Sequence, residues 1–137
     1  MPPALNMIGL VVANMGRSLA FYRRLGLDIP AAADDQPHVE VKLPGGLRLG
    51  WDTIDTIRSF DPDWTPPTGG SAQISLAFAC GSAAEVDQLY NQLVEAGCVG
   101  NKPPWDAFWG QRYAVVQDPD GNGIDLYAPL SVDEHTE

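Results

Sequence analysis

The chain has 137 residues, 45% of them apolar, and a formal net charge of −10 from 18 acidic and 8 basic side chains. This length and composition suit one globular domain whose core needs no disulfide or metal, and no apolar run is long enough to span a bilayer. The negative charge disfavours nucleic acid and anionic membranes as partners, and we expect a cytoplasmic protein whose two cysteines are reduced.

The first unit, residues 4–58, is predicted to contain four strands and one helix. In chain order these are a strand at Leu5–Ala13, a helix at Met15–Leu25, a short strand near Leu27–Pro30, and strands at His38–Leu43 and Leu47–Trp51. Asn14 is suited to cap the helix, and Gly26 is suited to end it. A Pro-Gly-Gly turn joins the last two strands.

A linker and a second unit of the same order follow. Proline and glycine in the segment 52–70 disfavour regular structure, so residues 59–70 are predicted to link the units. The second unit, residues 71–130, is predicted to contain a strand at Ala72–Cys80, a helix at Ala83–Ala96, a short strand near Val99–Lys102, and strands at Gln111–Gln117 and Gly123–Ala128. Ser82 and Glu85 form a capping box at the start of the helix. The polar tail, residues 131–137, is expected to be disordered.

The two units repeat one another. The stretch from Met7 into the first helix recurs 66 residues later (73 − 7 = 66), where Gln73 leads into the second helix. Positions that match between two such units are where a shared site is expected.

The opening segment 8–22 and the segment 109–126, with its Asp-Pro-Asp-Gly-Asn turn at 118–122, resemble the vicinal oxygen chelate superfamily. This superfamily includes glyoxalase I, extradiol dioxygenases, fosfomycin resistance enzymes and bleomycin resistance proteins. The resemblance covers about residues 5–130. It implies an α+β fold in which two tandem βαβββ units of one domain, residues 1–137, form a cupped, mostly antiparallel eight-stranded sheet with helices on the convex side.

The resemblance also implies where a metal would bind. Enzymes of this superfamily hold a divalent metal with a histidine on the first strand of each unit and a glutamate on the last strand of one or both. These positions fall on Met7, Gln73, Asp125, and Arg48 or Gly50 depending on register. A thioether, an amide and a guanidinium do not replace imidazoles and carboxylates. His38 is predicted on another strand and His135 in the tail, so the resemblance implies a member without metal or other cofactor.

Side-chain alternation predicts a cleft over one face of the sheet. That face carries small or polar residues such as Gly9, Ser75, Ala77 and Gly123, which leave space for a ligand. Two alternatives stay open, because an antiparallel sheet can expose one face to water and an oligomer can bury it.

Ten residues that fall near this face are candidates for binding a ligand, because they are aromatic, polar or charged or, for Met7, because the position is matched between the two units. They are Met7, Arg48, Trp51, Gln73, Ser75, Trp105, Phe108, Trp109, Arg112 and Asp125. Aromatic side chains in loops suit flat or cationic ligands. Core packing is the alternative for Trp51, and a surface salt bridge is the alternative for either arginine. Tyr113 is either a further donor or a core residue.

The favoured function is binding of a small aromatic or cationic compound, as in sequestration of a drug or natural product by bleomycin resistance proteins. The alternative is an enzyme of the same superfamily, a lyase, isomerase or dioxygenase, with Asp125 as base or with an unusual metal site. A homodimer is expected, because pairing with a second copy covers exposed strand edges. The cleft could close within one chain or between two.

Overall fold

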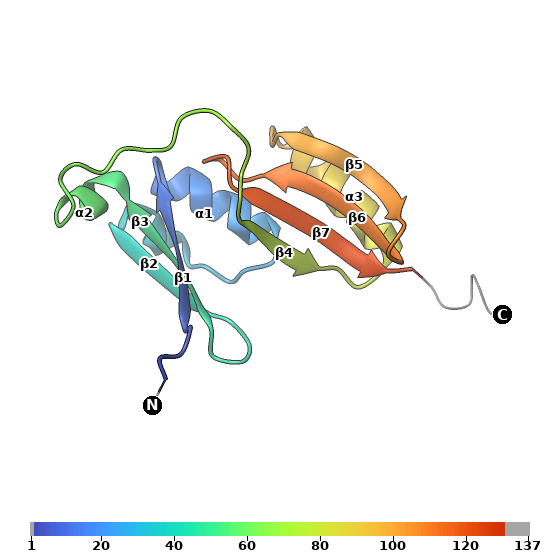
Figure 1. Cartoon of the computed structure of the whole chain (residues 1–137), viewed down its shortest axis with the longest axis horizontal. Helices are drawn as coiled ribbons and strands as arrows, with labels where there is room; N and C mark the ends of the chain where they lie inside the picture. The colour runs from blue at the N-terminus through green and yellow to red at the C-terminus, as the bar shows by residue number, and fades with distance from the viewer. Residues whose placement is uncertain (1, 131–137) are drawn as a thin grey trace. The chain divides into compact units, whose positions relative to one another are not determined.

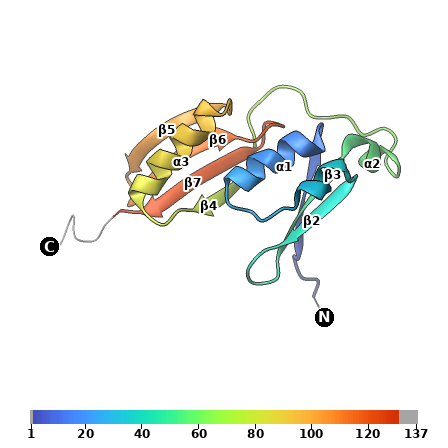
Figure 2. The same cartoon turned by 180° about the vertical axis from the view of Figure 1, so that it is seen from behind.

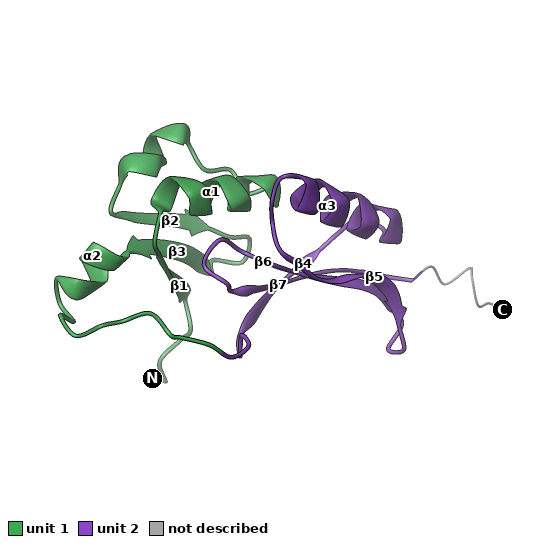
Figure 3. Ribbon diagram, turned by 90° about the horizontal axis from the view of Figure 1, so that it is seen from above, with its two compact units in different colours: residues 1–69 green, residues 70–137 purple. Residues whose placement is uncertain are grey.

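The computed structural model describes residues 2–130, and the predicted disordered tail at 131–137, with His135, lies outside the described residues. The chain divides into two compact units, residues 1–69 and residues 70–137 (Figure 3). Each unit has its own sheet and its own helix packed against that sheet.

The first unit is a three-stranded sheet with one long helix (Figure 1). Its elements are β1 (Met7–Val12), α1 (Met15–Arg24), a 3-10 helix η1 (Ala31–Asp35), β2 (His38–Lys42), β3 (Arg48–Thr53) and α2 (Ile54–Arg58). β3 is the central strand, with β1 parallel to it on one side and β2 antiparallel to it on the other.

Helix α1 begins and ends where local signals predict. The Asn14 side chain accepts a hydrogen bond from the backbone N–H of Arg17 at 2.8 Å, which satisfies one of the unpaired donors of the first turn. Gly26 has a φ of +96°, a left-handed conformation that glycine adopts without steric cost. The buried side of α1 packs on β3, where the Tyr22 and Trp51 rings meet edge to face at 5.4 Å between centroids.

The second unit is a four-stranded sheet of order β4-β7-β6-β5 with α3 along one face (Figure 2). Its elements are β4 (Ser75–Ala79), α3 (Ala83–Glu95), β5 (Gly100–Ala107), β6 (Gln111–Gln117) and β7 (Gly123–Pro129). β7 runs parallel to β4 and antiparallel to β6, and β6 runs antiparallel to β5.

The predicted helix cap and turn of this unit are present. Ser82 Oγ accepts the Glu85 N–H at 3.2 Å, while Glu85 Oε1 accepts the N–H of Gly81 at 2.6 Å, one residue earlier than in a standard capping box. In the turn before β7, Asp118 Oδ1 accepts the backbone N–H of Asp120 and of Asn122, each at 2.9 Å. Asp118 therefore closes the turn through its own side chain.

The strand predicted near Leu27–Pro30 does not form, so residues 2–130 contain seven strands in sheets of three and four instead of eight strands. The guanidinium of Arg23 donates to the Ile29 carbonyl at 2.7 Å and to the Pro30 carbonyl at 2.8 Å, and it forms an ion pair with Asp34 at 2.8 Å. A side chain thus takes the backbone acceptors that a neighbouring strand would need.

The largest other differences from the prediction concern α2 and β5. Helix α2 lies inside the segment expected to lack regular structure, because Thr53 caps it by accepting the Thr56 N–H at 3.2 Å. Strand β5 is longer than the predicted short strand at Val99–Lys102 and includes Pro103 and Pro104. It tolerates them because it is an edge strand, where a missing N–H leaves no neighbour unpaired.

No helix among residues 2–130 is long and apolar enough to cross a membrane. Cys80 and Cys98 are both thiols.

Candidate functional site

The face of the second sheet that lies away from α3 carries a carboxylate between two hydroxyl groups. Alternation along β6 and β7 places Tyr113 and Asp125 there, while Ala114 and Leu126 are fully buried on the face that α3 covers. Tyr113 Oη donates to Asp125 Oδ2 at 2.5 Å, and Ser75 Oγ donates to the same oxygen at 3.4 Å. Both bonds use Oδ2, and within residues 2–130 neither hydroxyl bonds to Oδ1.

The Tyr113 hydroxyl is held in its protonated form. Burial, the hydrogen bond to Asp125 and the negative charge of that carboxylate together raise the pKa of Tyr113 to about 12. Tyr113 is therefore a hydrogen-bond donor across the physiological range, and it fixes the orientation of the Asp125 carboxylate.

Aromatic rings surround Tyr113. We call Trp105, Trp109, Tyr113 and Tyr127 the aromatic cluster. Tyr113 is its centre, with ring centroids 5.6 Å from Trp105, 5.2 Å from Trp109 and 6.2 Å from Tyr127, the last pair being stacked. The Phe108 ring lies edge to face against the Trp109 ring, with 5.0 Å between ring centroids.

The outer side of the cluster faces solvent. Trp109 is 48% exposed and donates from Nε1 to the Gln111 side chain at 2.8 Å, which orients its ring. Phe108 is 96% exposed, and the ammonium of Lys102 lies 5.2 Å from the Trp105 ring centroid. The cluster therefore has exposed π surface at Trp109, and Tyr113 connects this ring to the Asp125 carboxylate.

Of the ten candidates, Ser75, Trp105, Phe108, Trp109 and Asp125 belong to this arrangement. The other five candidates have different surroundings within their own units. Gln73 is exposed and precedes β4, and Met7 and Arg48 lie in the first unit. Trp51 is fully buried beneath α1, as its core-packing alternative predicted.

Arg112 lies on the opposite face from the aromatic cluster. It forms ion pairs with Asp87 of α3 at 2.9 Å and with Asp106 of β5 at 3.0 Å. The hydrogen bond to Asp87 has the largest effect on the pKa of Arg112. Together with the bond to Asp106 it raises that pKa above the ordinary value. The role of Arg112 in the structure is to join α3 to β5 and β6. Tyr127, in contrast, was not a candidate, although its spacing of two residues from Asp125 places it on the same face.

Comparison with known proteins decides the family. A model of the Glyoxalase/Bleomycin resistance protein/Dioxygenase superfamily matches residues 4–126. The chain belongs to this superfamily. This match confirms the resemblance predicted from the sequence. A separate comparison with curated proteins found no match.

Solved structures of the superfamily share the fold. A glyoxalase/bleomycin resistance protein/dioxygenase from Nocardioides has a TM-score of 0.71 and 22% identity, covering 96% of this chain and 86% of that chain. A glyoxalase/bleomycin resistance protein/dioxygenase family enzyme from Burkholderia phytofirmans PsJN has a TM-score of 0.78 and 19% identity, covering 93% of this chain and 100% of that chain. Lactoylglutathione lyase from Agrobacterium tumefaciens has a TM-score of 0.61 and 21% identity, covering 93% and 95%. At these identities the likeness shows the fold alone.

The helix caps show which positions of the two superfamily units match. Met7 begins β1 seven residues before the cap Asn14 (14 − 7 = 7), and Ser75 begins β4 seven residues before the cap Ser82 (82 − 75 = 7). The structure therefore matches Met7 with Ser75 instead of with Gln73.

Strand pairing identifies the other two positions. Gly9 pairs with Gly50 across β1 and β3, and Ala77 pairs with Asp125 across β4 and β7. Because Gly9 and Ala77 each lie two residues after the start of their strand, Gly50 is the counterpart of Asp125. Arg48 lies opposite Met7 on the same face.

These four positions do not fit the divalent metal of superfamily enzymes. Met7 offers a thioether, Gly50 no side chain, Ser75 a hydroxyl and Asp125 one carboxylate, where three or four nitrogen or oxygen ligands are needed. The Met7 sulfur lies 3.4 Å from where a Gly50 Cβ would be, so it occupies part of the space of the missing side chain. Within residues 2–130, no group of three or more His, Cys, Asp and Glu side chains is placed to hold a metal ion.

The first sheet carries a charge network on the face away from α1, which sequence reasoning missed. The two ring nitrogens of His38 contact Asp52 at 2.5 Å and Glu40 at 2.7 Å, and Arg48 forms an ion pair with Glu40 at 2.7 Å. The Glu40 hydrogen bond, followed by the Asp52 bond, raises the pKa of His38 from its ordinary 6.5. The His38 bond lowers the pKa of Glu40 from 4.5.

We expect this network to make stability depend on pH. The folded pKa of His38 is raised, so its contribution is present below pH 6.5 and is lost as pH rises through the raised value. The lowered pKa of Glu40 gives a contribution that is lost as pH falls below 4.5. The loss of unfolding free energy in His38→Gln should therefore be largest between pH 4.5 and 6.5 and shrink at alkaline pH.

Urea denaturation of wild type and His38→Gln across this pH range measures the difference. His135 is present in both proteins, so its titration cancels. A difference that grows with rising pH would contradict the charged His38 bridge.

Proposed function

We propose that this protein binds a small, flat organic cation on the face of its second sheet, without a metal. The observation that carries the proposal is the Asp125 carboxylate, which accepts hydrogen bonds from Tyr113 and Ser75, with Tyr113 at the centre of the aromatic cluster. A protonated nitrogen of the ligand would donate to Oδ1, while its ring system would lie against Trp109 and Tyr127.

The forces at this site favour a cation over a neutral ligand. A cation against the face of a Trp or Tyr ring gains about 0.5–2 kcal/mol, more when water is excluded. Asp125 adds a charge-assisted hydrogen bond, and the net charge of −10 raises the local concentration of cations. Sequestration of such a compound, as in bleomycin resistance, is the biological role that these features support.

A second candidate, proton transfer by Asp125 in a lyase or isomerase reaction, has one supporting observation. The Tyr113 hydroxyl and the Asp125 carboxylate form a donor and acceptor pair on one face. We favour binding, because the rings of the aromatic cluster supply affinity for a flat ligand and the Asp125 carboxylate supplies a charge for a cation.

The test compares proflavine, a flat cation, with acridine, its neutral parent ring, by calorimetry in the presence of a chelator. We expect proflavine to bind more tightly than acridine. Asp125→Asn should reduce proflavine affinity about tenfold and leave acridine affinity nearly unchanged, because only the charge is removed. Chelation should change neither affinity.

Three outcomes would count against the proposal. Equal losses of affinity for proflavine and acridine would show that the charge of Asp125 has no role in binding. Loss of binding on chelation would show that binding needs a metal. Conversion of proflavine to a product would favour the enzymatic alternative.

A further inference from the structure

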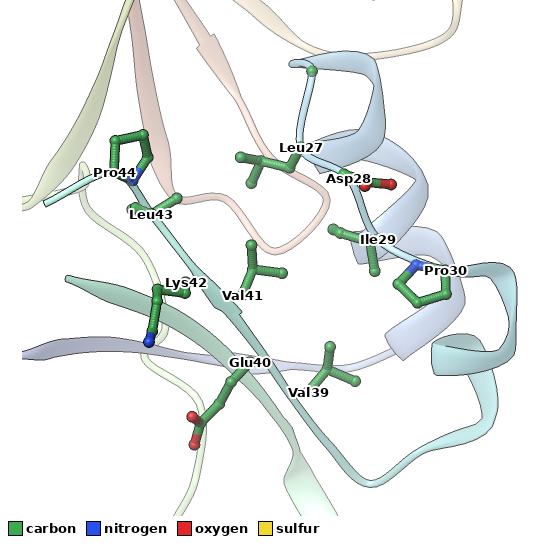
Figure 4. Close-up of a pocket in the computed structure, with 11 residues that line it drawn as sticks. Leu27, Asp28, Ile29, Pro30, Val39, Glu40, Val41, Lys42, Leu43 and Pro44 are labelled. Carbon is green, nitrogen blue, oxygen red and sulfur yellow. The ribbon is translucent and has the colours of Figure 1, made fainter. Parts of the chain in front are cut away.

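A groove runs along the outer edge of β2 in the first unit. Its volume is about 440 Å³, and its walls are mostly aliphatic. Val39 and Val41 of β2 point into it toward Leu27 and Ile29, while Glu40 and Lys42 point to the other side of the strand (Figure 4).

In the second unit, the position that corresponds to this groove is filled by a strand. Its strand β6 is covered by β5, whereas β2, which has the same place in its unit, is an edge strand within the described residues. The chain's own segment 27–30 does not pair with β2, because Arg23 binds the carbonyls of Ile29 and Pro30. The groove is therefore the place of a strand that the first unit does not supply.

The backbone groups of β2 that face the groove follow from its pairing with β3. Beyond the two ends of β2, the Thr53 N–H donates to the Pro37 carbonyl at 3.1 Å, and the Leu43 N–H donates to the Leu47 carbonyl at 2.7 Å. Odd-numbered residues of this segment thus bond to β3. The N–H and C=O groups of His38, Glu40 and Lys42 point to the outer edge instead.

We propose that a second copy of this chain pairs with the first through β2, antiparallel, with Val41 of the two copies opposite one another. In this register Glu40 of each copy lies opposite Lys42 of the other, and these residues can exchange both backbone hydrogen bonds. The apolar side chains of the incoming strand then lie against Leu27 and Ile29 in the groove.

Charge selects this register over its neighbours. A shift that centres the pair on Glu40 places two glutamates opposite each other, and a shift that centres it on Lys42 places two lysines opposite each other. Within one chain, Lys42 lies opposite Arg48, a like charge. Glu40 of the second copy offsets that repulsion.

The interface has a modest size, because β2 has five residues. Association in the micromolar to millimolar range is therefore expected, as for small interfaces. Strand β5, an edge of the second sheet, is less suited to such pairing because Pro103 and Pro104 lack an N–H.

The test uses two charge reversals, Lys42→Glu and Glu40→Lys, in the full chain. Each variant alone should be monomeric by sedimentation at concentrations where the wild type forms dimers. Mixing the two should restore a dimer that contains one copy of each, since every Glu then lies opposite a Lys. Arg17→Glu is the matched control for Lys42→Glu: it makes the same charge change at an exposed position of α1 and should dimerise like the wild type.

Hydrogen exchange on the wild type checks the interface without any substitution. The amides of Glu40 and Lys42 should become protected as concentration rises, whereas that of Val41, bonded to β3 throughout, should not change. A monomeric wild type, a Lys42→Glu variant that still dimerises, or a mixture that forms no heterodimer would overturn the proposal.

Discussion

Replacing Trp51 with alanine is expected to lower the free energy of unfolding by about 3–5 kcal/mol, the usual cost of removing a buried large aromatic side chain. Trp51 is 0% exposed and packs against Tyr22, which is also fully buried, so the cavity would lie between α1 and the first sheet. This loss is a large part of the 5–15 kcal/mol that holds a typical domain folded. Urea denaturation followed by circular dichroism measures it.

Trp51→Phe is the matched control. The indole Nε1 is buried without a hydrogen-bond partner among the described residues, so phenylalanine removes an unsatisfied donor while keeping most of the ring. Its loss of stability should be clearly smaller than that of alanine. If Trp51→Ala kept its stability and lost only ligand binding, Trp51 would belong to the binding site and the buried assignment would be wrong.

The helices and their ends could be predicted because their signals are local. Asn14 and Ser82 cap the next residues in the chain, and Asp118 closes a turn with backbone groups two and four residues away. The missing strand near residues 27–30 depends instead on Arg23, whose guanidinium takes carbonyls six and seven residues away. Strand alternation cannot reveal that kind of competition.

Part of the candidate site could also be predicted, because side-chain alternation along a strand is a local signal. Alternation along β7 places Asp125 on the open face, and the same alternation would have found Tyr127. Arg112 and Tyr113 are neighbours in one strand and so point to opposite faces, although both were possible donors to the predicted cleft. Matching Met7 to Ser75 required the positions of the helix caps.

Trp109→Ala is expected to weaken binding of proflavine about tenfold or more, because truncating an aromatic hot-spot residue costs about 2 kcal/mol or more and about 1.4 kcal/mol is a tenfold change. Trp109 contacts Trp105, Phe108 and Tyr113, and its ring is 48% exposed, so it offers π surface to a ligand without belonging to the core. The fold should therefore survive the change, as the unchanged urea midpoint of the variant would show. Phe108→Ala is the control, since Phe108 is 96% exposed and should have a much smaller effect on affinity. If both variants bind proflavine like the wild type, while Asp125→Asn still weakens it, the ligand lies against Asp125 from another direction and the aromatic cluster is not its wall.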